Sequence, residues 1–540
     1  MSLITTKIIS STNKCLPADD INAKCALSQI SMLKNERLSF QLAYRSDGAR
    51  VSAFLEIDSK LPIKAFRVDC VPVTRPGNAD SDYLSSPSSL YPDILTPVKN
   101  GDSIIPVAEL HSVMFTIEDE SGIEAGDYDV KVGLRANGEL FSETISVKVI
   151  DAMLPEQTLI HTQWFHNDCI ASYYGCDVFS ERHWELIGNY MEAAVRCGVN
   201  MILTPVLTPP LDTAVGHQRP TVQLVDVVVT DDGYEFGYDK LERYISTALE
   251  KGMKYFEISH LFSQWGAIHA PKVVGLVNGE LKQIFGWDTD AAGDEYRTFI
   301  RAFTSSLLDE LKKLGVDKKC YFHISDEPNN EQLESYTTAK NIVADILEGY
   351  HIMDALSNYE FYETGAVETP IPSSSHIDAF LEHNVPDLWT YYCCGQAHEV
   401  SNRFLAMPGQ RTRILGEQLY KFDIKGFLQW GFNFWYTCGS LAMVNPYLDE
   451  CGDNWVPAGD TFSVFPGTDG KAVYSLHSLL FCEALQDMRA LELLGEKIGR
   501  DMVIKLLDFG NEGLTFRHYA RTEGHSIAMR ELVNTMIANG

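Results

Sequence analysis

The N-terminal part of the chain shows the period-2 alternation of apolar and polar residues that is typical of strands. It is clearest in the segments 38–44 and 145–149, where every second residue is large and apolar. Asn137 and Gly138 separate two such runs, and this dipeptide favours a two-residue hairpin turn because both positions tolerate a positive φ. The pattern predicts an all-β domain over residues 1–152, which we expect to be a β-sandwich.

Beyond Leu154 and Pro155 the pattern changes to short apolar strands that alternate with amphipathic helices. Strands are expected at 159–165, 200–205, 254–260, 320–326, 352–357, 388–392, 413–416 and 426–434. Helices are expected at 181–196, 240–251, 294–314, 331–348, 376–383 and 472–494. This alternation favours a TIM-like (β/α)8 barrel over an open sheet, and no Gly-x-Gly-x-x-Gly motif follows the first strand. We therefore expect a barrel over residues 153–500 and a helical extension over 501–540 that packs on it.

Composition narrows the class of protein without identifying it. The 540 residues are 45% hydrophobic, which suits a globular chain of several domains, and no apolar run approaches the roughly 18 residues of a membrane helix. The net charge of -30 disfavours nucleic acids and anionic membranes as partners, because both repel an acidic surface. The N-terminus lacks the apolar segment of a signal peptide, and the cysteines show no zinc or redox spacing. These features favour a cytoplasmic protein with reduced thiols, and they leave the oligomeric state open.

Two adjacent carboxylates, Asp326 and Glu327, follow the fourth predicted strand, and Pro328 ends it. Catalytic groups of such barrels lie at the C-terminal ends of the strands, so this position points to an active site. Like charges so close together raise the pKa of one carboxyl, which then has a proton to donate at neutral pH. The same acids could instead belong to a capping cluster before a helix that begins at Glu331.

Other predicted strand ends also carry aromatic and polar residues, a combination that suits the apolar faces and hydroxyl groups of a sugar. The candidates for substrate binding are Trp164, His166, His260, Asn358, Tyr392, Glu417, Trp430, Asn433 and Trp435. Each has a structural alternative: the tryptophans can fill the core, and His260 can be a hydrogen-bonded core histidine. Neither His-x-His at a strand end nor His-Glu-x-x-His occurs, so we expect no metal and no other cofactor.

Three segments together resemble a known family. They are the run from His323 to Pro328, the run Gly-Phe-Leu-Gln-Trp-Gly-Phe-Asn-Phe-Trp at 426–435, and the amphipathic helix over 475–494. They are similar to the family 123 glycoside hydrolases and to the related domain of unknown function 4091. The resemblance covers nearly the whole chain and implies a β-sandwich followed by a TIM-like barrel.

The resemblance also implies a mechanism, the substrate-assisted and retaining cleavage of β-N-acetylgalactosaminides. Glu327 would protonate the glycosidic oxygen, and Asp326 would orient the 2-acetamido group whose carbonyl oxygen attacks the anomeric carbon. No protein nucleophile is then needed. Tyr392 would bond the acetamido oxygen, and Trp430 or Trp435 would form the sugar platform.

Glu417 departs from the family pattern and leaves a second mechanism open. At the end of the seventh predicted strand it could act as a covalent nucleophile about 5 Å from Glu327, on a sugar without an acetamido group. It could equally lie in the first turn of a helix, where an acid is favoured. A third hypothesis is a carbohydrate-binding protein without catalytic activity.

Overall fold

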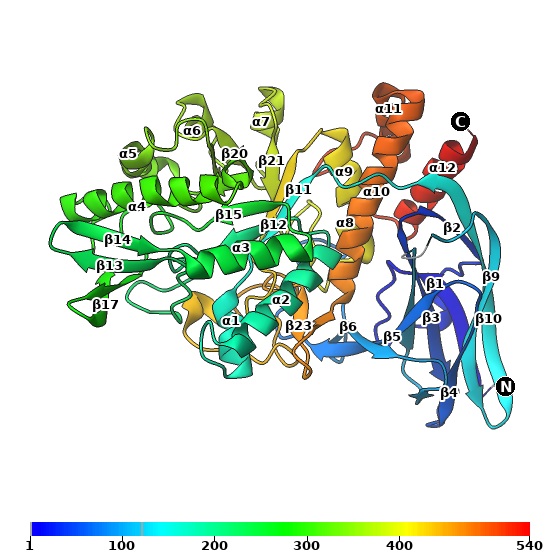
Figure 1. Ribbon diagram of the computed structural model, residues 1–540. Helices are drawn as coiled ribbons and strands as arrows, with labels where there is room; N and C mark the ends of the chain where they lie inside the picture. The colour runs from blue at the N-terminus through cyan, green and yellow to red at the C-terminus, as the bar shows by residue number, and fades with distance from the viewer. Residues whose placement is uncertain (1–2, 120–121, 540) are drawn as a thin grey trace.

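The computed structural model describes residues 3–119 and 122–539 (Figure 1). The N-terminal part forms two five-stranded sheets. The first has the order β1 (Ile4–Ser10), β3 (Arg37–Ser46), β8 (His111–Glu118), β5 (Ile63–Pro72), β6 (Leu90–Val98). The second has the order β2 (Gln29–Lys34), β10 (Glu139–Met153), β9 (Gly126–Ala136), β4 (Ala53–Asp58), β7 (Ser103–Ile104).

Both sheets turn their apolar residues toward one shared core. Phe40 and Phe115 of the first sheet stack at 5.3 Å and lie in the same cluster as Val132 and Val147 of the second. Residues of opposite parity lie on the other face of each sheet, as the period of a strand requires, and in the first sheet this face is also buried, with Met114 packed against Leu476 and Leu480. The predicted hairpin is confirmed, because Ala136 pairs with Glu139 across the Asn-Gly turn, whose two residues both have positive φ.

The second part is a near-closed barrel of eight parallel strands, as predicted. Their order is β20 (Thr369–Ile371), β19 (His351–Ala355), β18 (Cys320–Phe322), β15 (Tyr255–Ile258), β12 (Met201–Thr204), β11 (Ile160–Gln163), β22 (Gly426–Gln429), β21 (Trp389–Tyr391). A parallel bridge between Ser373 and Tyr391 joins the two ends of this series. The barrel therefore brings the C-terminal ends of all eight strands to one mouth.

The prediction for the sixth and seventh strands is wrong. The segment 388–392 holds the seventh strand, and the sixth is β20, whose three residues include Pro370 and give no readable pattern. The predicted strand 413–416 is helical and lies across α8 (Gly409–Arg413) and α9 (Leu415–Lys421). Its apolar residues are buried because α9 packs against α10 (Leu476–Ile498), where Gly416 meets Ala484.

Helices cover the outside of the barrel between successive strands. They are α1 (Asn167–Tyr174), α2 (Glu181–Arg196), α3 (Asp239–Lys251), α4 (Asp294–Lys313), α5 (Leu333–Val343), α6 (Glu360–Glu363) and α7 (Asp378–Glu382), followed by α8, α9 and α10. None of the helices in the described residues is long and apolar enough to cross a membrane.

Two small sheets supplement the barrel. The first has the order β14 (Gly233–Gly237), β13 (Asp226–Thr230), β16 (Val273–Val277), β17 (Glu280–Phe285). Its strands lie in the connections that follow β12 and β15, so this sheet belongs to the C-terminal end of the barrel. The second pairs β23 (Val464–Pro466) with β24 (Ala472–Tyr474) before α10.

Of the last two helices, α11 (Arg500–Gly510) packs on α9 and α10, whereas α12 (His525–Asn539) also contacts the N-terminal sheets. In Figure 1, α10 lies between the barrel and the N-terminal sheets, and α12 contacts both α10 and strands β2 and β10. Arg530 of α12 donates to Glu36 at 2.7 Å and to Asp487 of α10 at 2.9 Å, and all three side chains are buried. The expectation that this extension packs on the barrel was therefore incomplete, since it also ties the barrel to the sheets.

The close contact of α9 with α10 predicts opposite outcomes for two helical glycines. A Cβ at Gly416 would lie 2.0 Å from the carbonyl oxygen of Ala484, whereas a Cβ at Gly188 in α2 would meet only side-chain atoms at 3.7 Å. We expect Gly416→Ala to lower the free energy of unfolding by about 1–3 kcal/mol. Gly188→Ala should leave it unchanged or raise it by up to about 1 kcal/mol, because alanine has the higher helix propensity. Melting temperatures measure both, and equal stability of the two variants would contradict this packing.

Candidate active site

The Asp-Glu pair lies at the mouth of the barrel just beyond β18. Asp326 is 4% exposed, whereas Glu327 is exposed to solvent. The backbone of the pair is held by the neighbouring connections: the Trp265 N–H donates to the Asp326 carbonyl at 2.9 Å, and the Glu327 N–H donates to the Ala355 carbonyl at 3.0 Å. These backbone hydrogen bonds, at the ends of β15, β18 and β19, hold the segment so that Asp326 is buried and Glu327 is exposed.

Helix capping does not account for these acids. Asn329 caps the short 3-10 turn Asn330–Gln332: its side chain accepts from the Glu331 N–H at 3.0 Å, and its own N–H donates to the Gln332 side chain at 3.0 Å. Neither carboxylate of the pair takes part in this cap, so both side chains are available for another role.

Glu327 and two residues near the pair adopt left-handed backbone conformations. The φ angles are 45° at Glu327, 49° at Asp212 and 57° at Trp265. For residues other than glycine this conformation costs about 1–2 kcal/mol each. Such strain persists only where the surroundings impose it, and it concentrates at functional sites.

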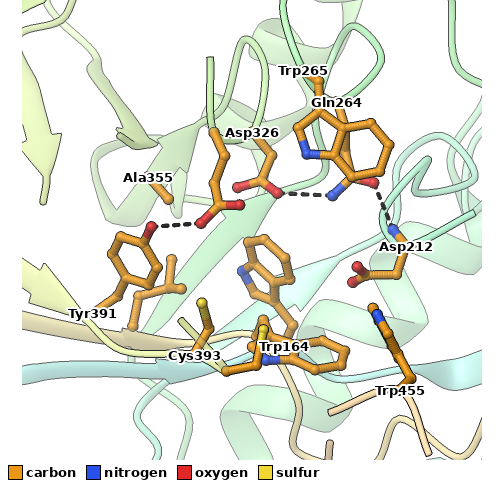
Figure 2. A pocket seen from close by; sticks show the side chains of 13 residues that line it. Trp164, Asp212, Gln264, Trp265, Asp326, Ala355, Tyr391, Cys393 and Trp455 are labelled. Atoms are coloured by element: carbon orange, nitrogen blue, oxygen red, sulfur yellow. Dashed lines mark hydrogen bonds between the residues drawn. The ribbon is translucent and has the colours of Figure 1, made fainter. Parts of the chain in front are cut away.

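A pocket of about 150 Å³ opens beside the carboxylates (Figure 2). Its walls combine aromatic rings with a few polar groups, the composition expected of a small-molecule site. The aromatic residues are Trp164, Trp265, Tyr391, Trp430 and Trp455, and the polar ones are Asp212, Gln264, Asp326 and Glu327, with Ala355, Cys393, Cys394 and Leu428 between them.

Hydrogen bonds orient both carboxylates, as Figure 2 shows. The Gln264 amide donates to Asp326 Oδ2 at 2.8 Å, and its oxygen accepts from the Asp212 N–H at 2.6 Å. The Tyr391 hydroxyl donates to Glu327 Oε1 at 2.5 Å. Asp326 Oδ1 is buried and has no partner among the described residues. One oxygen of the buried acid is therefore held in place while the other is free to bind a ligand.

Burial and the repulsion between neighbouring carboxylates raise the pKa values of two acids in the site. Burial, and then the adjacent Glu327, raise the pKa of Asp326 well above its ordinary value. Burial likewise raises the pKa of Asp212 to about 7, against an opposing effect of Arg219. This agrees with the expectation that one carboxyl of the Asp-Glu pair has a raised pKa.

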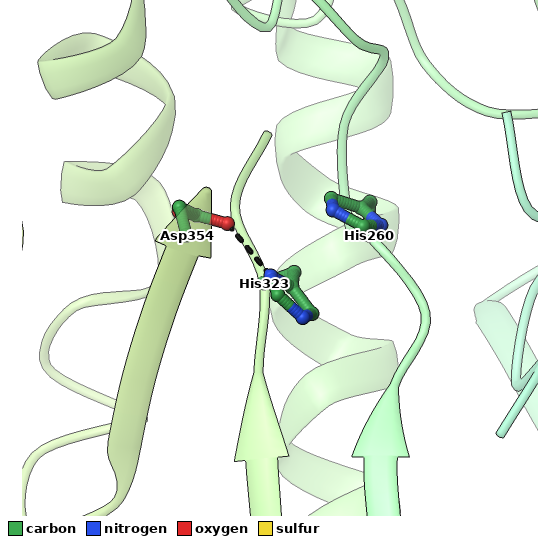
Figure 3. Close-up of side chains that lie close together, drawn as sticks. All are labelled: His260, His323 and Asp354. Atoms are coloured by element: carbon green, nitrogen blue, oxygen red, sulfur yellow. Dashed lines mark hydrogen bonds and ion pairs between the residues drawn. The ribbon is translucent and has the colours of Figure 1, made fainter. Parts of the chain in front are cut away.

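A buried histidine, His323, lies between Asp354 and His260 (Figure 3). His323 lies 2.7 Å from Glu257 and 2.9 Å from Asp354, and all three side chains are fully buried. Burial alone lowers the pKa of His323, but the hydrogen bonds to Asp354 and Glu257 outweigh it and raise the pKa to about 10. His323 is thus an imidazolium at neutral pH, and it donates to carboxylates on both neighbouring strands.

His260 is buried beside the charged ring of His323. Its ring stacks on that of His323 at 4.2 Å, neither of its nitrogens has a partner in the described part of the chain, and burial lowers its pKa well below the ordinary value. The ligand atoms of His260, His323 and Asp354 lie close enough together for a metal ion. Both nitrogens of His323 already contact carboxylates, however, so this arrangement fits a buried ion pair better than a set of metal ligands.

A second buried group joins the N-terminal sheets to α10. His477 Nδ1 lies 2.9 Å from Asp93, and its Nε2 lies 2.9 Å from the Phe462 carbonyl oxygen. Asp93 also accepts from the His477 N–H in the first turn of α10. The ligand atoms of Asp93, Glu450 and His477 are close enough for a metal ion, but Asp93 and His477 are already hydrogen-bonded to each other.

The structure brings four of the predicted site residues together and places the others elsewhere. Trp164 and Trp430 line the pocket with Asp326 and Glu327. Tyr392 lies outside it, packed against Phe427 and Phe481. The residue before it, Tyr391, lines the pocket instead, because successive side chains of a strand point to opposite sides.

The remaining candidates support the pocket or lie apart from it. The Asn433 side chain exchanges hydrogen bonds with the backbone of His166 at 2.9 and 3.0 Å, and the His166 ring contacts the Trp430 carbonyl at 3.1 Å. Trp435 is fully buried. Asn358 is half-buried and does not line the pocket.

The placement of Glu417 at a strand end is wrong. It lies in the first turn of α9, it is buried, and its carboxylate accepts from Asn511 at 2.9 Å and contacts His525 at 3.3 Å. These partners belong to the C-terminal part of the chain, and Glu417 is absent from the pocket lining. The pairing of acids at the ends of strands four and seven is therefore not formed.

The residues that sequence reasoning missed lie mainly in long connections. Gln264 follows β15 and gave no signal of its own, whereas the adjacent Trp265 is an aromatic residue close to the end of the third predicted strand. Asp212 and Trp455 lie in loops without periodic pattern, where only the folded chain shows that they face the pocket.

Comparisons with known proteins agree on one family. A family model described as "Glycoside hydrolase 123, catalytic domain" matches residues 164–494. A solved family 123 glycoside hydrolase from Clostridium perfringens, described in a study of glycolipid glycan hydrolysis, is similar in fold. Its TM-score is 0.75 at 16% identity, over 99% of this chain and 98% of that chain. A β-glucuronidase from Parabacteroides merdae matches 84% of this chain and 50% of its own at 10% identity, but its TM-score of 0.30 is too low to bear on function. No curated protein matches.

The buried imidazolium predicts a pH-dependent stability. The pKa of His323 rises from 6.5 to about 10 on folding, so its stabilising contribution is complete below pH 6.5 and is lost as the pH rises toward 10. Nitrogen NMR should show a doubly protonated His323 ring at about pH 8, where an ordinary histidine is neutral. His323→Gln should lower the free energy of unfolding by about 3–5 kcal/mol at neutral pH, since it leaves two buried carboxylates without their charged partner. A lowered melting temperature would report this loss. Titration of His323 near its ordinary pKa would contradict this assignment.

Proposed function

This chain belongs to glycoside hydrolase family 123 and is a glycosidase, and we propose that it cleaves β-linked N-acetylhexosaminides with retention by substrate-assisted catalysis. The observation that carries the proposal is the asymmetry of the Asp-Glu pair at the barrel mouth. Asp326 is buried and has one free oxygen, whereas Glu327 is exposed. An N-acetylgalactosaminide is the substrate we favour, on the family resemblance.

Glu327 is proposed as the general acid and later the general base. Its exposed carboxyl can reach the glycosidic oxygen of a sugar bound in the pocket, and the Tyr391 hydroxyl bonded at 2.5 Å fixes its orientation. Protonation of the departing oxygen in the transition state is the step in which a positioned acid contributes most for a poor leaving group.

Asp326 is proposed to bind the 2-acetamido group. Its free Oδ1 would accept the acetamido N–H while the acetamido carbonyl oxygen attacks the anomeric carbon. A new bond then forms between that oxygen and C1, the bond from C1 to the glycosidic oxygen breaks, and the leaving oxygen takes the proton of Glu327. Water, deprotonated by Glu327, opens the bicyclic intermediate from the opposite face, which gives net retention.

The shared proton has a defined place in this scheme. In the free site, burial beside Glu327 favours the protonated form of Asp326. A substrate N–H bonded to Asp326 favours its ionised form, so the proton is left to Glu327, where the reaction needs it. The negative charge of Asp326 then stabilises the positive charge that develops on the acetamido group.

The aromatic walls are proposed to bind the apolar faces of the sugar, with Trp164 and Trp430 as the principal surfaces.

We assign the catalytic unit to residues 153–500. Among their described residues, the β-sandwich we infer for 1–152 and the extension 501–540 contribute no side chain to the pocket. The covalent mechanism with Glu417 as nucleophile has no support in the geometry, because that side chain is bonded to Asn511 and His525.

Removal of the acid tests the role of Glu327. Glu327→Gln keeps the size of the side chain but has no proton to donate, so we expect a loss of about 10²- to 10⁴-fold in kcat on unactivated glycosides. Aryl glycosides with good leaving groups should lose less. An unchanged rate on an unactivated substrate would remove Glu327 from this role.

Removal of the charge at Asp326 tests the mechanism and the function together. Asp326→Asn should lose most activity on an aryl β-N-acetylgalactosaminide, and a thiazoline mimic of the bicyclic intermediate should inhibit the wild type. Glu417→Gln serves as the matched control and should retain kcat, since its carboxylate lies outside the pocket. A wild type that cleaves no N-acetylhexosaminide, or a covalent adduct trapped by a 2-fluoro glycoside, would refute the proposal.

A further inference from the structure

The wall of the pocket that faces away from Tyr391 carries a third carboxylate. Figure 2 shows Asp212 and Tyr391 at opposite ends of the pocket, with Asp326 between them. We propose that Asp212 binds hydroxyl groups of the sugar and makes the enzyme selective for neutral sugars over sulfated or carboxylated ones. This inference rests on the proposed function and adds to it the charge class of the substrate.

The backbone of Asp212 is held on both sides. Its N–H donates to Gln264 at 2.6 Å, and its carbonyl accepts from the Ser440 hydroxyl at 2.7 Å. The next turn is tied by the Ala214 N–H, which donates to the Gly439 carbonyl at 3.0 Å. These contacts hold Asp212 at a left-handed φ of 49°, which is unusual for a residue other than glycine. This backbone conformation directs the Asp212 side chain into the pocket.

The carboxylate of Asp212, in contrast, has no hydrogen-bond partner among the described residues. Arg219, the cation that opposes the raised pKa of Asp212, already donates to both oxygens of Asp168 at 2.7 Å. The loop thus fixes the position of Asp212 through its backbone, while its side chain remains available. Preorganised acceptors of this kind are suited to bind the hydroxyl donors of a ligand.

Gln264 links this wall to the catalytic pair. Its amide nitrogen donates to Asp326 and its oxygen accepts from the backbone of Asp212, so one side chain sets the separation of the two acids. A sugar bound to Asp212 is therefore held at a defined position relative to Asp326, on which the proposed reaction depends.

Charge determines what this wall accepts. The lining contains the three acids Asp212, Asp326 and Glu327, and no lysine, arginine or histidine occurs among the described residues that form it. A sulfate or carboxylate group on the sugar would meet acidic side chains and no cation there, in a partly desolvated site where repulsion from an ionised carboxylate is strongest. Neutral hydroxyl groups, which donate hydrogen bonds to carboxylates, meet no such barrier.

The test compares wild type with Asp212→Asn on an aryl β-N-acetylhexosaminide and on its 3-, 4- and 6-O-sulfated forms. The wild type should strongly prefer the neutral substrate. Asparagine keeps the shape but removes the charge, so kcat/KM on the neutral substrate should fall about 10- to 100-fold, mainly through KM. The preference over at least one sulfated form should narrow by about tenfold or more, which a merely structural role would not produce. Asp232→Asn, in the exposed β13–β14 turn, removes one charge away from the pocket and should change neither value.

Calorimetric titration with free N-acetylhexosamine and its sulfates needs no turnover and separates the two proposals. A wild type that binds the neutral sugar but does not cleave the aryl β-N-acetylhexosaminide would refute the proposed function alone. Equal affinity of wild type and Asp212→Asn for the neutral sugar, or an equal loss on neutral and sulfated sugars with unchanged melting temperature, would overturn the role of Asp212.

Discussion

The buried charge of His323 is the interaction on which the geometry of the barrel mouth depends. Its two ring N–H groups donate to Glu257 of β15 and to Asp354 of β19, so one charged side chain after β18 joins three adjacent strands. Glu257 also accepts from Trp164 at 2.8 Å, which extends the same network to β11 and to the pocket wall. Without the imidazolium, two buried carboxylates would lose their charged partner, a loss that is costly in a protein interior. The segment that carries Asp326 and Glu327 directly follows His323 in the chain, so this network anchors its start.

The pair gains its asymmetry from backbone geometry rather than from residue type. Strand alternation ends with β18, and the left-handed conformation of Glu327 turns its side chain outward while Asp326 stays buried. Two chemically similar acids thereby acquire different solvation and different partners, Gln264 for one and Tyr391 for the other. Such a difference in environment is how adjacent carboxylates come to perform different steps.

The rest of the chain supports this mouth without entering it. Arg413 donates to Asp487 at 2.7 Å and Arg530 joins the same carboxylate to Glu36, a buried network that connects α8, α10, α12 and the N-terminal sheets. The buried pair of His477 with Asp93 does the same at the first turn of α10. These contacts keep the sheets and terminal helices fixed against the barrel, on the side of α10 rather than at the pocket.

The sequence by itself determined the features that depend on local period and on chain order. These include the Asn-Gly hairpin, the alternation of strands and helices, and the Asp-Glu pair beyond the fourth strand, all of which the fold retains. Only the tertiary structure decided the sixth strand, whose three residues are too short for any period, and the true place of Glu417. It also decided that Tyr391 rather than Tyr392 faces the site, and that Asp212 reaches it from a long loop. The direction of a side chain at a strand end and the path of an irregular loop depend on contacts with segments distant in the sequence, which no local pattern encodes.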